Sequence, residues 1–172
     1  MESENVLDTC LELLKQRNYV DIQQLDSIFS IYARKSNDKK VCLVFHKQTK
    51  FNVAHVQEYT SRMKHEDIDH VIIVIQNTVT PMAKKVIENS CDIDIELFVR
   101  DELVFNITKH VLVPEHIKLD ESDAALIRKR FGSKLPILSR NDPVSRFYGF
   151  KRLDIIKIIR KKTGFVAYRI VK

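Results

Sequence analysis

Residues 135–160 read LPILSRNDPVSRFYGFKRLDIIKIIR, and this stretch decides the fold of the second half of the chain. Asp142 followed by Pro143 is typical of a helix start, because aspartate caps the first amides and proline has no amide that needs a partner. Gly149 supplies the left-handed residue that ends a short helix. The β-branched run 155–159 then predicts a strand. The stretch contains no nucleophile paired with a base, so we expect it to form contacts with a partner and not to catalyse a reaction.

The rest of this half predicts a small α+β domain at residues 110–172. Residues 111–118 read as an extended, strand-like segment, and Asp120 caps a predicted helix over 121–131. Acidic residues in the first turn of this helix and basic residues in its last turn complement the helix dipole. Residues 165–171 alternate in polarity after a Thr-Gly turn, so we expect them to form a hairpin with the strand before them.

The first half alternates helices with apolar strands, which predicts a three-layer α/β domain at residues 1–109. The expected helices are 5–17, 53–64 and 81–89, and the expected strands are 27–34, 41–45, 70–75 and 93–99. The first two strands form a hairpin around a polar turn. We expect a short linker after Tyr19, and we expect the most apolar run, 70–75, to be the central strand.

The order of these elements is also the core order of restriction-endonuclease-like folds, so a nuclease has to be considered. Such enzymes hold Mg²⁺ with an acid near the hairpin and with an acid and a lysine two residues apart on the next strand. Asp26 is a candidate for the first acid, but residues 41–47 on the next strand contain no carboxylate. We therefore expect this core to have no active site.

Other sites are not expected either. His110 and His116 lack a third or fourth ligand at suitable spacing, so we interpret them as structural or interface histidines. The sequence contains no glycine-rich phosphate loop and no supported Ser/Cys–His–Asp set. We expect no catalytic residue, no bound metal and no cofactor.

Charge divides the chain into two parts. Residues 1–109 contain 14 Lys and Arg and 17 Asp and Glu, a net charge of −3, whereas residues 110–172 contain 15 and 6, a net charge of +9. A basic half of this kind faces nucleic acid or an acidic protein surface, and charge alone does not choose between them. Three distant cysteines, Cys10, Cys42 and Cys91, indicate buried thiols in a reducing compartment.

No membrane partner is expected. No apolar run approaches the roughly 20 residues that a spanning helix needs. The acidic beginning, Met-Glu-Ser-Glu-Asn, lacks the basic and apolar regions of a signal peptide.

The opening stretch resembles a known family in the order L-P-x-[I/L]-x(3)-D-P-V-x-R-[F/Y]-Y-G-x-K-R, followed by a strand that ends in K-I-I-R. It is similar to the small RNA polymerase subunit called H in archaea, whose eukaryotic counterpart is the fifth subunit common to nuclear polymerases I, II and III. The matching residues are Leu135, Pro136, Leu138, Asp142, Pro143, Val144, Arg146, Phe147, Tyr148, Gly149, Lys151, Arg152 and 157–160. Residues 111–118 resemble the V-P-E-H element of the same family. Residues 72–84 and 97–110 resemble parts of the N-terminal jaw domain that the eukaryotic form carries and the archaeal form lacks.

The resemblance implies a non-catalytic structural subunit of DNA-directed RNA polymerase, shared by polymerases I, II and III. Residues 110–172 would be an assembly domain anchored to the largest subunit, and residues 1–109 a jaw near downstream duplex DNA that does not read sequence. The expected interface residues are Pro114, Glu115, His116, Asp142, Pro143, Arg146, Tyr148, Gly149, Lys151, Arg152, Arg160 and Arg169. The expected DNA-proximal residues are Thr80, Pro81, Lys84 and Lys85.

Several alternatives stay open. Lys84 and Lys85 oppose the dipole of the helix that Thr80 caps, so they lie either on a solvated face or against a phosphate backbone. A free-standing nucleic-acid-binding protein with a degenerate nuclease fold would bind duplex DNA without other subunits. The expected location is the nucleus, or the cytoplasm or a virion if the source is a virus of eukaryotes. The sequence does not say which of polymerases I, II and III the chain joins, or whether it serves all three.

Overall fold

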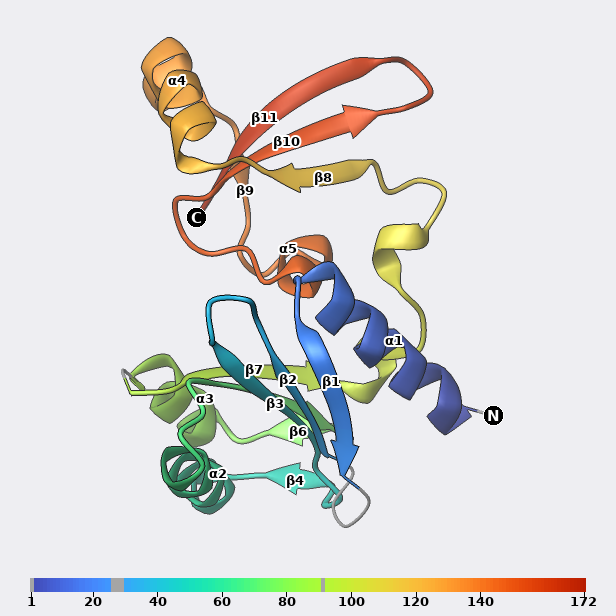
Figure 1. The fold of residues 1–172 in the computed structure, drawn as a ribbon, viewed down its shortest axis with the longest axis vertical. Coiled ribbons are helices and arrows are strands. Elements are labelled where there is room, and N and C mark those ends of the chain that lie inside the picture. Colours follow the sequence, from blue (N-terminus) through green and yellow to red (C-terminus); the bar gives the residue numbers. More distant parts are fainter. Residues whose placement is uncertain (1, 26–29, 91) are drawn as a thin grey trace. The chain divides into compact units, whose positions relative to one another are not determined.

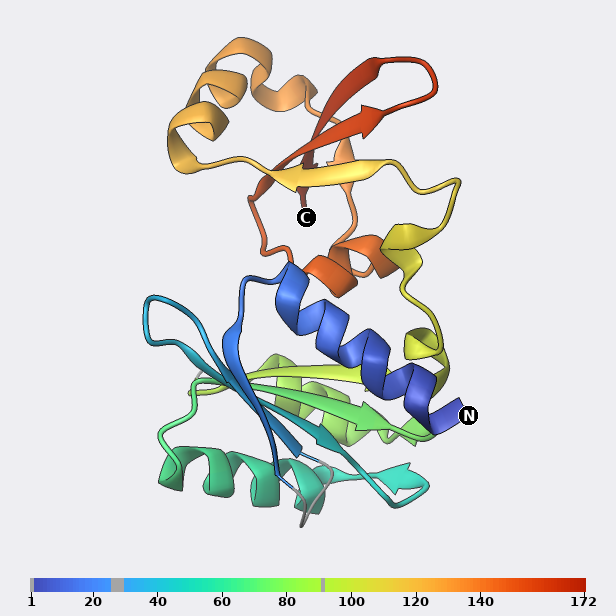
Figure 2. The same ribbon diagram turned by 45° about the vertical axis from the view of Figure 1, so that its right-hand side comes forward.

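The computed structural model describes residues 2–25, 30–90 and 92–172 (Figures 1 and 2). The chain divides into two compact units, Met1–Phe105 and Asn106–Lys172. The division expected from the sequence, between residues 109 and 110, falls a few residues later. Each unit has its own sheet and its own core, and each is described by itself.

The first unit is built on a five-stranded sheet with the strand order β1-β2-β3-β5-β7. Its strands are β1 (Val20–Leu25), β2 (Ser30–Arg34), β3 (Lys40–Phe45), β5 (His70–Ile75) and β7 (Asp94–Val99). The first three strands pair antiparallel, and β3, β5 and β7 are parallel. One face is covered by α1 (Glu2–Gln16), and the other by α2 (Val53–His65) and α3 (Pro81–Glu88), as Figures 1 and 2 show. The expected three-layer α/β arrangement is therefore present.

Two expectations about this sheet are wrong. The segment after Tyr19 is not a linker, because β1 runs along β2 as an edge strand. Asp21 has a φ of 51°, and the register is irregular between Val20 and Gln23, so the strand shows no clean alternation in sequence. Because β1 adds a strand at this edge, the central strand is β3 and not β5. Of the expected strand 27–34, the part 27–29 lies outside the described residues.

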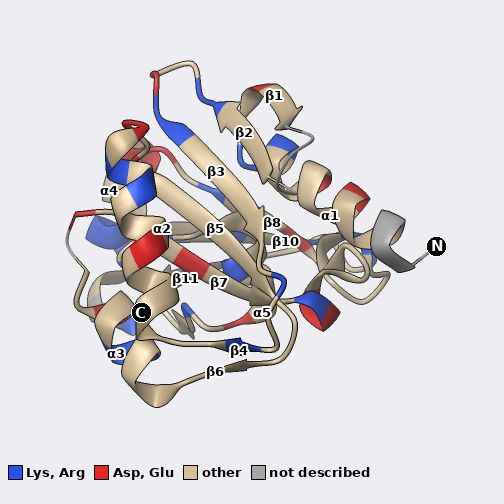
Figure 3. Ribbon diagram, turned by 90° about the horizontal axis from the view of Figure 1, so that it is seen from below, with Lys and Arg blue, Asp and Glu red and all other residues tan. Residues whose placement is uncertain are grey.

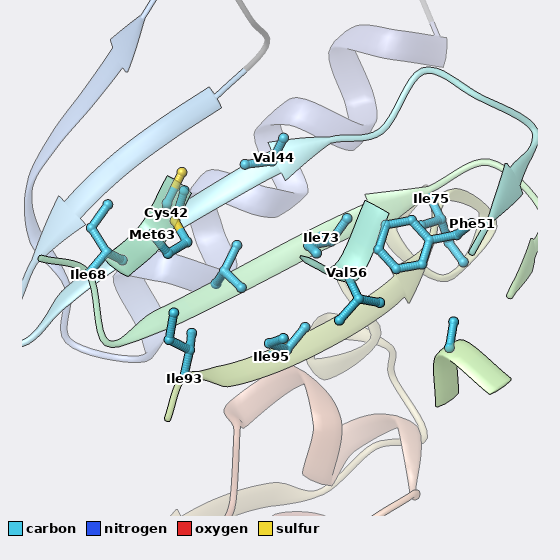
Figure 4. Close-up of a cluster of buried hydrophobic side chains, with 12 residues drawn as sticks. Cys42, Val44, Phe51, Val56, Met63, Ile68, Ile73, Ile75, Ile93 and Ile95 are labelled. Carbon is cyan, nitrogen blue, oxygen red and sulfur yellow. The ribbon is translucent and has the colours of Figure 1, made fainter. Parts of the chain in front are cut away.

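One part of the core of the first unit lies between the sheet and α2 and α3. Cys42, Val44 and Ile73 point to this face from β3 and β5, and they meet Val56 and Met63 of α2 (Figure 4). Burying a large aliphatic side chain contributes roughly 1.5–3 kcal/mol. Both faces of the parallel strands are covered, which explains why β5 is apolar along its whole length.

A second, two-stranded sheet fixes the starts of α2 and α3. It pairs β4 (Lys50–Phe51) in parallel with β6 (Thr78–Val79), and the sequence did not predict it. The Thr80 amide donates to the Phe51 carbonyl at 3.0 Å. Asn52 caps α2 by accepting from the His55 amide at 3.2 Å, while His55 Nδ1 accepts from the Asn52 amide at 3.2 Å. Because the strands are parallel and hydrogen-bonded, the two helix N-termini start from the same short sheet.

The second unit is built on a four-stranded sheet with the order β8-β10-β11-β9. Its strands are β8 (Glu115–Lys118), β9 (Ile137–Leu138), β10 (Ile155–Arg160) and β11 (Phe165–Val171). The strands β8, β10 and β11 are antiparallel, and β9 pairs in parallel with the end of β11. The helices are α4 (Glu121–Phe131) and α5 (Pro143–Tyr148), and the short 3-10 turns of the chain are η1 (Arg100–Leu103), η2 (Ile107–Lys109) and η3 (Gly132–Lys134). Two small clusters fill this unit, one around Ile156 and Ile158 and one around Ile155.

These elements confirm the expected α+β arrangement of the second half, with the helix over 121–131, the short helix after Asp142 and the terminal hairpin in place. The expected extended segment 111–118 is a strand only from Glu115 onward. Within residues 2–25, 30–90 and 92–172, no helix combines the length and the apolar character needed to cross a membrane.

Candidate functional site

A short capped helix forms a rigid corner in the second unit. Asp142 Oδ1 accepts hydrogen bonds from the amides of Val144 at 2.9 Å and Ser145 at 3.3 Å, as expected of an N-cap. Gly149 has a φ of 66°, and its amide donates to the Arg146 carbonyl at 3.0 Å, which ends the helix. The cap and the stop predicted from the sequence are both present.

Side chains on both sides hold this corner in place. Phe147 is buried in the unit, and the Tyr148 ring stacks on Phe150 with 5.1 Å between centroids and 11° between planes. Asp154 Oδ2 accepts from the Lys151 amide at 2.8 Å, and the same carboxylate pairs with an ammonium group on β8 at 2.8 Å. The corner is therefore fixed from the helix, from the following loop and from the sheet.

An open groove of about 500 Å³ lies at one end of the sheet of the second unit; we call it the C-terminal groove. It is lined by Thr108, residues 111–115, Tyr148 and residues 160–163. Four of the expected interface residues line it together: Pro114, Glu115, Tyr148 and Arg160. These residues were named as interface residues from the family resemblance, and the structure brings them together at one groove. Their contact with a partner stays a prediction.

The other expected interface residues do not line this groove. Arg146 is half-buried on α5, and Lys151 and Arg152 are exposed just beyond it. His116 Nδ1 lies 2.8 Å from the Pro114 carbonyl, and burial lowers the pKa of this imidazole. Arg169 donates to the Ile137 carbonyl at 3.1 Å, which ties β11 to β9. Asp142, Pro143 and Gly149 shape the corner through their backbone and cap geometry.

The expected DNA-proximal residues lie at the start of α3 in the first unit. Thr80 Oγ1 accepts from the Ala83 amide at 3.3 Å, and Pro81 is the first helical residue. Lys84 and Lys85 are both exposed, and they colour part of α3 blue in Figure 3. The structure therefore offers two cations near a capped helix start, and this placement alone does not distinguish a solvated face from a phosphate contact.

The end of β3 is where a restriction-endonuclease core would carry its acid and lysine. In this chain the strand and the residues after it, 40–47, have no carboxylate, and Asp26 lies outside the described residues. His46 is buried instead, with its ring 5.0 Å from Phe51 and its Nδ1 3.2 Å from the Tyr59 hydroxyl. Burial lowers the pKa of His46, so we interpret it as a neutral packing residue.

A buried ionic network lies at the opposite end of the parallel strands. Arg17 donates to both oxygens of Glu96, at 3.0 and 2.8 Å, and His70 Nε2 lies 3.0 Å from Glu96 Oε1. The hydroxyl of Tyr19 lies 2.9 Å from His70 Nδ1, and burial raises the pKa of this tyrosine to about 12. Among the described residues, His70, Asp94 and Glu96 are the group whose atoms are close enough to hold a metal ion. Because Arg17 already occupies both Glu96 oxygens, we interpret the group as a structural ion pair.

The sequence did not predict two of these structural features. The Arg17–Glu96 pair joins the end of the first helix to a strand 79 positions later, and one sequence carries no signal for such a pairing. The aliphatic loop at Val111 and Leu112 lines the C-terminal groove, although it was read only as part of a strand. Their high exposure is a property of the folded unit, so only the structure reveals it.

Family models match the two units separately. The model described as RNA polymerase Rpb5, C-terminal domain, matches residues 105–171, which include the capped corner and the groove. The model described as restriction endonuclease matches residues 1–106, which confirms the predicted fold of the first unit. The two units thus define a protein that joins an endonuclease-type domain to an RNA polymerase subunit domain.

Similarity to curated proteins extends across this junction. The shared subunit rpabc1 of DNA-directed RNA polymerases I, II and III of Dictyostelium discoideum is 30% identical over 183 residues, covering 94% of this chain and 93% of that protein. The subunits RPABC1 of Caenorhabditis briggsae and Caenorhabditis elegans are 34% and 33% identical over 134 residues, covering 74% of this chain and 64% of each nematode protein. The chain belongs to the family of the subunit shared by RNA polymerases I, II and III, which confirms the resemblance seen in the sequence.

Proposed function

We propose that this chain is a non-catalytic structural subunit of a eukaryotic-type DNA-directed RNA polymerase. The observation that carries the proposal is the similarity to the Dictyostelium discoideum subunit, which spans 94% of the chain and therefore includes both units. A chain that shared only the endonuclease-type domain would support a different function. Because the related subunits belong to nuclear polymerases, we propose that this chain is located in the nucleus.

The second unit is the proposed anchor on the largest subunit. It carries a net charge of +9 over residues 110–172, and its corner is held in one conformation by the Asp142 cap, the Gly149 stop and the Asp154 contacts. A rigid surface loses little conformational entropy on binding, which favours a permanent interface. The exposed or half-buried cations on and after α5, Arg146, Lys151 and Arg152, are the proposed contacts.

The first unit is the proposed jaw near downstream duplex DNA. Lys84 and Lys85 project into solvent next to the capped start of α3, where a phosphate would meet both ammonium groups. Such contacts attract the DNA backbone without reading base sequence. The attraction would be salt-dependent, since it depends on neutralised phosphates.

The match of residues 1–106 to the restriction-endonuclease model favours one second candidate, a nuclease or a nucleic-acid-binding protein that acts alone. Against it, residues 40–47 offer no carboxylate to a metal ion, and Glu96 is bound by Arg17. Metal-assisted cleavage needs carboxylates that are free to coordinate. We therefore propose that this domain has lost, or never had, a catalytic centre.

Affinity purification through a tag on the chain tests the two candidates together. The subunit proposal predicts that the large polymerase subunits co-purify and that the isolated chain leaves plasmid DNA intact in Mg²⁺. Cleavage that needs Mg²⁺ and disappears in Asp26→Ala would establish the nuclease instead. Tight duplex binding by the isolated chain at physiological salt would favour the free-standing binding protein.

A further inference from the structure

The C-terminal groove exposes aliphatic side chains on a loop that is itself ordered. Val111 and Leu112 are 76% and 77% exposed. The loop that carries them is held by hydrogen bonds, because the Val113 amide donates to the His110 carbonyl at 2.9 Å and the Leu112 amide donates to His110 Nδ1 at 3.3 Å. Two neighbouring aliphatic residues held out in water at the rim of a groove indicate a surface that a partner covers.

The opposite wall of the groove is basic. Arg160 ends β10, and Lys161 and Lys162 lie in the turn that joins β10 to β11. The turn is fixed by the Gly164 amide, which donates to the Arg160 carbonyl at 2.9 Å. Lys161 lies 3.3 Å from Glu115, the one acidic residue of the lining. Within the described parts of the chain, Lys162 forms no ion pair. The groove lining thus combines three cations and one carboxylate with the exposed aliphatic side chains of Val111 and Leu112.

These features favour a protein over a nucleic acid as the occupant. Tyr148 is the one aromatic residue among the described residues of the lining, and one face of its ring already stacks on Phe150. Proteins that bind single strands use aromatic platforms for stacking, and the groove lining offers aliphatic side chains in that place.

We propose that the C-terminal groove binds an extended segment of another polymerase subunit in which an apolar side chain is flanked by carboxylates. The apolar side chain packs on Val111 and Leu112, and the carboxylates pair with Lys161, Lys162 and Arg160. This inference rests on the proposed function, because it takes the partner from the polymerase. It adds the chemistry of the bound segment and assigns it to the groove.

Photocrosslinking within the assembled polymerase tests this assignment. A benzophenone amino acid replaces Leu112, which is 77% exposed, so the change leaves the core untouched. The matched control carries the same amino acid in place of Leu126, which is 65% exposed on α4 and does not line the groove. We expect a crosslink from position 112 to a segment of a polymerase subunit that contains an apolar residue next to Asp or Glu. The yield from position 126 sets the background.

Reversing the charge of the lysines in the groove lining is a second test of the proposal. Lys161→Glu with Lys162→Glu should lower the crosslink yield at position 112 at least about twofold, since each exposed pair contributes about 1.4- to 5-fold. The pair Lys129→Glu and Lys134→Glu, exposed lysines outside the lining, should leave the yield unchanged.

Each outcome separates this inference from the proposed function. An incorporated chain that crosslinks only at background level, to a basic segment or to nucleic acid overturns the groove assignment and leaves the polymerase subunit standing. A crosslink that survives charge reversal undiminished overturns the role of the carboxylates. A wild-type chain that does not co-purify with polymerase subunits overturns the proposed function itself.

Discussion

Replacing Glu96 by glutamine is the sharpest test of the first unit as a structural domain. The Glu96 carboxylate receives two N–H groups from Arg17, at 3.0 and 2.8 Å, and the two side chains are only 16% and 4% exposed. Glu96→Gln keeps the shape but leaves the guanidinium buried without its counter-charge. Breaking a buried pair in this way costs about 3–5 kcal/mol, which is roughly a third to a half of the stability of a domain near 10 kcal/mol.

Urea unfolding followed by circular dichroism measures the loss directly. We expect a lower midpoint with an unchanged slope for Glu96→Gln. The control Glu88→Gln changes an exposed carboxylate at the end of α3 and should alter stability by no more than about 0.5 kcal/mol. The double change Arg17→Met with Glu96→Leu should recover much of the loss, because it removes both buried charges together.

The pH dependence of stability tests the same ion pair, because the direction of the change can be predicted. Burial alone would raise the pKa of Glu96, but the Arg17 charge and the His70 contact hold it well below the ordinary value of 4.5. A depressed carboxylate pKa stabilises the fold above pH 4.5, and this contribution is lost as the pH falls through the folded value. The wild type should therefore lose stability below that pH more steeply than Glu96→Gln. Equal slopes of stability against pH for the two proteins, or a loss of stability under about 1 kcal/mol in Glu96→Gln, would refute the buried ion pair. Stabilisation by Mg²⁺ would point to a metal site.

Three further predictions concern the proposed contact surfaces. Asp142→Ala should cost about 1 kcal/mol in urea unfolding, because it removes the acceptor of two helix amides, whereas Asp142→Asn should cost much less. Arg146→Ala or Tyr148→Ala should reduce recovery of the chain with the largest polymerase subunit; normal incorporation of both variants would remove the anchoring role. Lys84→Glu with Lys85→Glu should leave assembly intact and weaken crosslinking of the first unit to downstream DNA; an undiminished crosslink would leave the two lysines as a solvated face.

The sequence predicted elements whose signals are local. Asp142-Pro143 and Gly149 mark a helix start and stop through the chemistry of one or two residues, and the structure contains both. Thr80-Pro81 marks the start of α3 in the same way. Alternating or continuous apolar runs likewise predicted most strands, because a strand in a covered sheet must bury its side chains.

What the sequence did not predict depends on pairing across distance. The strand β1 has polar glutamines and a positive φ at Asp21, so it exists because β2 offers it an edge. The strand β5 was predicted as the centre of the sheet because it is the most apolar run, but the five-stranded order places β3 there. The Arg17–Glu96 pair and the C-terminal groove arise in the same way, from residues that only the folded chain brings together.

The expected interface residues stay a prediction, and the structure shows where they lie. Pro114, Glu115, Tyr148 and Arg160 were named from the family resemblance, and the fold brings them to one groove. Arg169 came from the same resemblance, yet its guanidinium contacts the Ile137 carbonyl within the unit. A resemblance identifies positions that a family keeps in order along the chain, and it does not say which side each residue faces.

The central claim is that this chain is a working part of an RNA polymerase. Its most direct test immobilises the enzyme through a tag on the chain, measures the molar ratio of the chain to the largest subunit, and assays RNA synthesis on the beads. We expect equimolar amounts of the chain and the largest subunit, together with template-dependent RNA synthesis. A tagged chain that is recovered without the largest subunit and without RNA-synthesising activity would contradict it.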